Sequence, residues 1–199
     1  MCIHLEFNYK KAVQAISYFA IKEGGRIDKM KVIKLIYFAD RYHMRKYNRP
    51  ITNDEYFAMS YGPVASGVKD IAEMSSFLGE KEAKYAEIYL KVPDRNQIES
   101  LQSDLDTVFS KSDIEALDFA WQNFGHLNQF QLFNITHEYP DLKKHELKLK
   151  ERSRIRMNYE DFFEDPPESF NKCHPLTDEE KLLSREHLKR LSHLESLWS

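Results

Sequence analysis

His137 and Glu138 are adjacent side chains near the end of a predicted helix, and they could form an acid–base pair. Together with the carboxylate of Asp40, these side chains could serve a small hydrolase or transferase if all three converged in an open pocket. His137 also has a simpler role, because a histidine near a helix C-terminus interacts favourably with the helix dipole. We therefore predict no catalytic site, and we keep an enzyme as a less favoured alternative.

The sequence carries no other recognisable catalytic or metal-binding pattern. It has no phosphate-binding glycine loop, no Cys-x-x-Cys pair and no His-Glu-x-x-His motif. Cys173 and His174 are adjacent, but sequence neighbours do not by themselves form a nucleophile–base pair. We predict no cofactor, no metal site, and an unreactive thiol in a loop at Cys173.

A basic stretch over residues 143–156 could contact the phosphates of a nucleic acid. However, Glu146 and Glu151 interrupt it, aromatic residues are sparse within it, and an acidic stretch follows over 160–168. A solvated face, or a surface for an acidic protein partner, therefore explains the stretch better than a nucleic-acid site does. Nucleic-acid binding stays the less favoured alternative.

Composition indicates an ordered globular protein. The 199 residues are 42% hydrophobic and 13% aromatic, and the net charge is −3, which gives no general attraction to nucleic acids or membranes. Cys2 and Cys173 are too few for a disulfide framework, which favours a reducing compartment. No apolar run is long enough to cross a bilayer, and the first residues do not resemble a signal peptide. We expect a soluble cytoplasmic protein.

The remaining elements are arranged around the stretch from Asp28 to Val64. Asp28 is a candidate N-cap, and Ile27 and Val32 have the spacing of a hydrophobic staple. Apolar residues at three- and four-residue steps predict an amphipathic helix that Arg49-Pro50 closes. These residues are Met30, Ile33, Ile36, Tyr37, Met44 and Tyr47.

Asp40 falls within the apolar stripe of that helix, seven residues after Ile33. Burying a carboxylate there is costly without hydrogen-bond partners. We therefore expect a dedicated partner, which could be a backbone N–H or one of three arginines. A carboxylate that fixes the following turn is preferred over a functional one. The three candidate arginines are Arg41, Arg45 and Arg49.

Two alternating segments, 55–61 and 84–92, predict strands of a small antiparallel sheet packed on helices. Between them, Gly62-Pro63 bends the chain into a helix with Pro63 in its first turn. Further helices are predicted by apolar periodicity and capping patterns, with one of the capping boxes starting at Ser112. Their segments are 8–22, 98–108, 114–124, 128–139 and 159–163. The fold class is mainly α (α+β).

A domain edge is predicted at Asp165-Pro166-Pro167, which divides the chain into 1–166 and a C-terminal helical extension, 167–199. Thr177 begins a capping box for the last helix. That helix carries an apolar stripe that could pack internally, bind a partner or support homo-oligomers. The stripe includes Leu183, Leu188, Leu191, Leu194, Leu197 and Trp198.

Three sequence segments carry a resemblance to a known family. They are LIYFAD, RPITNDEYFAMSYGPV and, further downstream, FGHLNQFQLFNITHEYP. Their content and order resemble the Panacea domain of SocA-like antitoxins, which bacteria and their phages encode, and the resemblance spans Tyr9 to Pro166. One position departs from it: the family often has a tryptophan shortly after Thr-His-Glu, where this chain has Asp141-Leu142-Lys143.

The resemblance implies an antitoxin that neutralises a co-encoded toxin by direct binding, with delivery of the toxin to a protease as the alternative. Some members of the family carry an added DNA-binding module, but we find no added helix-turn-helix in this sequence. Occlusion of the toxin and its delivery to a protease both stay open. The resemblance points to a structural and functional motif formed by Tyr37, Asp40, Thr136, His137 and Glu138. Aromatic and leucine-rich surfaces supply the candidate partner-binding residues. These candidates are Tyr56, Phe57, Tyr61, Gly62, Pro63, Leu191, Leu194 and Trp198.

Overall fold

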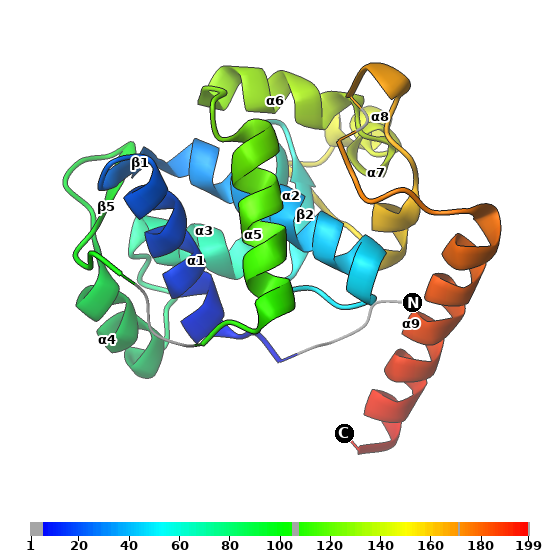
Figure 1. Cartoon of the computed structure of the whole chain (residues 1–199), viewed down its shortest axis with the longest axis horizontal. Helices are drawn as coiled ribbons and strands as arrows, with labels where there is room; N and C mark the ends of the chain where they lie inside the picture. Colours follow the sequence, from blue (N-terminus) through cyan, green and yellow to red (C-terminus); the bar gives the residue numbers. More distant parts are fainter. Residues whose placement is uncertain (1–5, 105–107, 171, 199) are drawn as a thin grey trace.

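Helix α2 (Lys29–Tyr47) runs through the middle of the molecule, and helices α1, α3, α5 and α6 pack against it (Figure 1). The computed structural model describes residues 6–104, 108–170 and 172–198, excepting the side chains of residue 192 and of residues 194–198. As predicted, Asp28 caps α2 by accepting a hydrogen bond from the Lys31 N–H at 3.0 Å. The helix ends at Tyr47, where Asn48 adopts the left-handed conformation two residues before Pro50.

Within those residues the chain forms nine α-helices and two short 3-10 helices, so the predicted mainly helical α+β class is confirmed. Capping boxes at Asn128 and Thr177 are also confirmed. The box predicted at Ser112 is wrong by two residues, because Ser110 caps α5. Besides α2, the helices are α1 (Tyr9–Lys22), α3 (Ser66–Glu73), α4 (Glu80–Tyr89), α5 (Lys111–Phe124), α6 (Gln129–Glu138), α7 (Pro140–Lys143), α8 (Glu146–Leu149), η1 (Tyr159–Phe163), η2 (Glu168–Phe170) and α9 (Asp178–Trp198).

Two three-stranded antiparallel sheets flank the helices, where the sequence predicted one sheet. The first has the order β1-β5-β4, and the second has the order β3-β2-β6, so the strands near residues 57 and 90 belong to different sheets. The strands are β1 (Arg26–Asp28), β2 (Tyr56–Met59), β3 (Gly62–Ala65), β4 (Leu90–Lys91), β5 (Gln97–Ser100) and β6 (Arg154–Arg156).

Three predicted elements differ from the structure. The 84–92 strand is wrong, since α4 occupies most of it and only Leu90–Lys91 forms a strand. The helix predicted over 98–108 is also wrong where it is described, because Gln97–Ser100 pairs with β1 and β4 as a strand. Pro63 lies in β3 rather than in the first turn of a helix, because the hairpin partner Ala58 pairs with it and delays the helix to Ser66.

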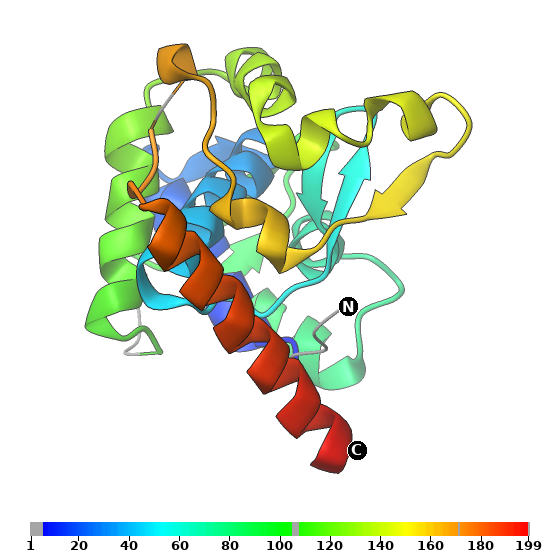
Figure 2. The same cartoon turned by 90° about the vertical axis from the view of Figure 1, so that its right-hand side faces the viewer.

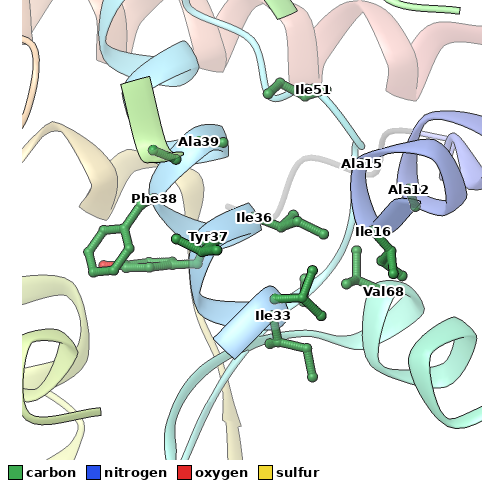
Figure 3. Close-up of a cluster of buried hydrophobic side chains, with 14 of the residues drawn as sticks. Ala12, Ala15, Ile16, Ile33, Ile36, Tyr37, Phe38, Ala39, Ile51 and Val68 are labelled. Atoms are coloured by element: carbon green, nitrogen blue, oxygen red, sulfur yellow. The ribbon is translucent and has the colours of Figure 1, made fainter. Parts of the chain in front are cut away.

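The core surrounds α2 and draws buried side chains from α1, α3, α5, α6 and η1, and Figure 3 shows the part between α1, α2 and α3. Aliphatic side chains from α1, α2 and α3 meet in the space between these helices. The side chains labelled there are Ala12, Ala15, Ile16, Ile33, Ile36, Tyr37, Phe38, Ala39, Ile51 and Val68. None of the helices in the described residues is long and apolar enough to span a bilayer.

Helix α9 packs along one edge of the body, and its C-terminal end extends beyond the other elements (Figure 2). Arg45 of α2 holds the segment that leads into α9: its guanidinium donates to the carbonyl oxygens of Phe163 and His174 and pairs with Asp165 at 2.6 Å. Leu188 is buried against the body. The predicted division into 1–166 and 167–199 stays a prediction, and these contacts describe how its two parts meet.

Candidate functional site

The hairpin formed by β2 and β3 exposes Tyr61, the first residue of the Tyr61-Gly62-Pro63 segment, to solvent. Ser60 and Tyr61 form its two-residue turn, and Met59 pairs with Gly62 across it. The Tyr61 side chain is 69% exposed, and its ring lies 6.2 Å from that of Phe133 on α6. The hairpin therefore projects an aromatic side chain beside α6.

Position 62, directly after this turn, requires a glycine because of its backbone conformation and because a side chain has no room there. Its φ is +95°, which residues with a Cβ rarely adopt. A Cβ built there would lie 2.7 Å from Lys34 Nζ and 2.7 Å from Thr136 Oγ1. The Tyr61-Gly62-Pro63 corner is therefore seated directly on side chains from α2 and α6.

Beside this corner is an open groove of about 750 Å³, which we call the corner groove. Its walls come from the start of α2, the hairpin, α3, the 92–96 loop and the start of α6. Phe130 is 65% exposed and contributes to the rim together with Tyr61. The lining side chains used below are Ile33, Lys34, Met59, Tyr61, Val64 and Phe130.

Lys34 lines this groove although only 1% of the residue is exposed. Its ammonium donates to the Pro63 carbonyl oxygen at 2.8 Å. No carboxylate lies within ion-pair distance of it among the residues that the structure describes. Burial lowers the pKa of Lys34 to about 7, since the charged form loses hydration that the single carbonyl does not replace.

The acidic groups around the groove have partners of their own. Asp28 accepts from the Lys31 N–H, Glu73 pairs with Lys69 at 2.6 Å, and Asp94 accepts from the Asn96 N–H at 2.8 Å. Of the other cations, Lys29 donates only to the Asp94 carbonyl oxygen at 3.4 Å. Neither Lys29 nor Arg95 forms an ion pair with any described residue. With Lys69 paired to Glu73, the groove keeps three cations, Lys29, Lys34 and Arg95, against two carboxylates, Asp28 and Asp94, so it combines apolar walls with one excess positive charge.

The partner-binding candidates of the hairpin differ in accessibility. Tyr56 is 3% exposed and donates its hydroxyl to Asp40, so its role in this structure is to support the strand. Gly62 and Pro63 are buried as well. Phe57 is half-buried beneath Arg154, whose guanidinium carbon lies 5.1 Å from the ring centroid. Of these residues, Tyr61 is the one that a partner could contact most fully.

Asp40 is fully buried. Of the partners expected for it, a backbone N–H is present, and two hydroxyl groups bind the carboxylate as well. Its carboxylate accepts from Ile51 N at 2.7 Å, from Thr52 Oγ1 at 2.7 Å and from Tyr56 OH at 2.8 Å. Burial raises the pKa of Asp40, and these hydrogen bonds oppose the rise. None of the three candidate arginines binds it, since Arg41, Arg45 and Arg49 each contact other groups. Asp40 therefore fixes the turn between α2 and β2.

The side chains of the Thr136-His137-Glu138 motif contact residues other than Asp40. Thr136 Oγ1 donates to the Phe133 carbonyl, and the His137 ring packs on Phe133 with 4.1 Å between the centroids. Glu138 pairs with Lys143 at 3.2 Å. Because Asp40 is sealed in the core, it cannot share an open pocket with His137 and Glu138. The geometry proposed for a hydrolase or transferase is therefore absent from this arrangement of the described residues.

The basic 143–156 stretch does not form one continuous surface. It spans two short helices and β6, and several of its cations have partners elsewhere. Lys144 pairs with Asp161, and Arg156 pairs with Glu55 at 2.6 Å. These ion pairs reduce the charge available to phosphates. In the residues that the structure describes, no cluster of acidic, histidine or cysteine side chains could hold a metal ion.

On α9 the leucines of the predicted stripe point in different directions. Leu188 is 2% exposed, Leu191 is half-buried, and Leu183 is exposed like its neighbour Leu182. The side chains of Leu194 and Trp198 lie outside the described part of the structure.

Sequence reasoning missed Lys34, Phe130 and Arg95 as site residues. For Lys34 a signal was available, since it lies four residues after Met30 and three before Tyr37, which places a lysine on the apolar side of the helix. For Phe130 and Arg95 the sequence offered none, because their approach to the hairpin depends on tertiary packing.

Most of the residues that line the corner groove lie within a region that matches a known family. The family model of the SocA-like antitoxin, Panacea domain, matches residues 32–142, which is more than half of the chain. The chain therefore belongs to the SocA-like antitoxin family with a Panacea domain. The match is shorter than the resemblance from Tyr9 to Pro166, but it includes most of α2, the hairpin and α6. No curated protein and no solved structure matches the chain.

Proposed function

We propose that this protein neutralises a co-encoded toxin by binding it directly, with the hairpin turn and the corner groove as the main contact surface. The observation that supports this proposal most is the exposure of Tyr61 and Phe130, two aromatic side chains on the rim of one groove. Exposed aromatic residues beside a concave apolar surface are typical of sites that bind another protein. We place this interaction in the cytoplasm of a bacterial or phage-infected cell, as expected for the family.

Co-expression with the neighbouring reading frame tests this proposal. The neighbour should inhibit growth when expressed alone, become harmless with this chain present, and co-purify with it. A neighbour that is harmless alone and never co-purifies would contradict the proposal.

A matched pair of variants tests the surface. Tyr61→Ala should weaken the complex by about tenfold or more, as expected for an aromatic residue at an interface centre. Phe77→Ala is the control, because Phe77 is 86% exposed but does not line the groove. If the two variants weakened binding equally, the hairpin would not be the contact surface.

Delivery of the toxin to a protease is the second candidate, because delivery requires a surface that remains accessible in the toxin complex. Helix α9 offers one, since Leu182 and Leu183 are both 57% exposed and lie on a helix that extends from the body (Figure 2). The same surface could instead support homo-oligomers. Replacing Leu182 and Leu183 with Glu should then weaken the corresponding complex without unfolding the body, because both side chains are exposed. The toxin's half-life with and without this chain separates delivery from occlusion, since occlusion leaves the half-life unchanged or longer.

A further inference from the structure

Lys34 is a buried cation that pairs with no carboxylate among the described residues. An ammonium group has three N–H donors, and among the described residues the Pro63 carbonyl is the acceptor within hydrogen-bond distance. Lysines are rarely buried this far unless they are paired. Other buried cations of α2 illustrate the usual arrangement: Arg45 donates to several carbonyls and pairs with Asp165, and Lys31 pairs with Glu23 at 2.6 Å.

The place of Lys34 within the fold gives it access to a ligand. It lines the corner groove directly behind the Gly62 corner, with Lys29 on the same groove wall and Arg95 on the 92–96 loop. The acidic groups that face the groove, Asp28, Glu73 and Asp94, already accept from other groups. With the Lys69–Glu73 pair set aside, three cations face two carboxylates on the groove, and this excess favours an anionic group beside Lys34.

The remaining walls favour apolar side chains. Ile33 lies next to Lys34 on α2, Met59 and Val64 come from the hairpin, and Tyr61 and Phe130 form the exposed rim. A ligand that satisfies both features carries an anionic group within an apolar surface, and a polypeptide segment with an Asp or Glu between aliphatic or aromatic residues does so.

We propose that the corner groove binds an apolar segment of the toxin polypeptide through an Asp or Glu side chain, whose carboxylate pairs with the ammonium of Lys34. This inference rests on the proposed function and deepens it, because it assigns chemistry to the toxin's contact segment. The apolar neighbours of that carboxylate pack on Tyr61 and Phe130, and they exclude water from the ion pair.

The first experiment measures toxin affinity for wild type and for Lys34→Met, with Lys84→Met as the control. Lys84 is an exposed lysine on α4 that pairs with Glu80, so its replacement makes the same change in charge away from the groove. Lys34→Met should lose about 30-fold or more in affinity, and Lys84→Met should stay within about twofold, because only the buried pair is strong. A folded Lys34→Met variant that binds like wild type would overturn the inference while leaving the proposed function intact.

The partner carboxylate can be identified by replacing each Asp and Glu of the toxin with Asn or Gln. One of these replacements should weaken binding to wild type but cause no further loss with Lys34→Met. If no toxin carboxylate couples to Lys34 in this way, the inference is wrong.

Two further arms cover the case in which that variant does not fold and the case in which the toxin does not bind. If Lys34→Met fails to fold, wild-type affinity is measured from pH 6 to pH 9. The affinity should fall as pH rises through the titration of Lys34, and a flat profile counts against the inference.

If the neighbouring product does not bind at all, the proposed function fails. Binding of two peptides, acetyl-Leu-Phe-Glu-Leu-Phe-amide and its Gln analogue, then tests whether the corner groove binds a carboxylate. Equal affinity of the wild-type chain for both peptides overturns the inference.

Discussion

The hydroxyl of Tyr37 donates to Asp141 Oδ2 at 2.6 Å, which joins the two halves of the family match across 104 residues of sequence. Both residues are fully buried, and Arg41 lies close to the same carboxylate, with 3.7 Å between Arg41 Nε and Asp141 Oδ1. The guanidinium of Arg41 also stacks over Tyr139 at 4.7 Å. Asp141 begins Asp141-Leu142-Lys143, the segment that departs from the family resemblance, and it belongs to a buried polar network.

Tyr37→Phe should destabilise the protein by about 1–3 kcal/mol, because it leaves a buried carboxylate without its hydroxyl donor. Denaturant unfolding followed by circular dichroism measures this loss. Tyr42→Phe is a suitable control, since the Tyr42 hydroxyl donates to Glu115, whose side chain is 40% exposed and can be solvated instead. Equal losses in the two variants would show that burial does not strengthen the Tyr37 bond.

Lys34 should make stability depend on pH. Its pKa is about 7 in the folded protein, whereas an unfolded lysine titrates at about 10.4. Between these values the unfolded state binds more protons than the folded state, so the free energy of unfolding should increase as pH rises from about 7 to about 10. Unfolding of wild type and Lys34→Met across this range measures the effect. The variant should have a flatter profile, and parallel profiles would contradict the lowered pKa.

Gly62→Ala should destabilise the protein by about 1–3 kcal/mol or more, because alanine is strained at positive φ and its Cβ meets Lys34 and Thr136. Gly25→Ala separates these two causes: Gly25 has a φ of +106°, but a Cβ there meets nothing within 4 Å. Thermal unfolding should show a larger loss for Gly62→Ala than for Gly25→Ala. Similar losses would mean that the hairpin shifts to admit the methyl group.

Helix α9 should be stabilised through one buried leucine. When α9 and the body unfold together, Leu188→Ala should lower the free energy of unfolding by about 2–5 kcal/mol, since it removes a buried side chain from its contacts. Leu183→Ala should stay within about 0.5 kcal/mol, because Leu183 is exposed. Hydrogen exchange of α9 amides measures both effects. If Leu188→Ala left the protection of α9 unchanged, the leucine would not hold the helix to the body.

The central part of the fold could be predicted from sequence because its signals are local. The cap at Asp28, the apolar stripe of α2 and the glycines after α1 act through neighbouring residues, and the structure agrees with each. The errors occur where local patterns compete. Residues 84–92 alternate like a strand, but strong helix formers and the Gly79–Glu82 cap favour α4. β5 forms because it pairs with β1, about 70 residues earlier, and no local pattern records such a partner.

The site was predictable only in part for the same reason. The sequence indicated that Tyr61 and Gly62 form a corner, and it placed a carboxylate that fixes a turn at Asp40. It also included Tyr56 and Pro63 among the partner-binding candidates, although both are buried, because alternation along a strand does not tell which face is covered. The groove itself depends on how α2, α3, α6 and the hairpin meet.

The close approach of Gly62 to Lys34 and Thr136 implies a rule for how this family varies. A relative with a larger residue at the position of Gly62 has no room for that side chain unless the residues equivalent to Lys34 and Thr136 are shorter. Substitutions at these three positions should therefore be correlated among homologues.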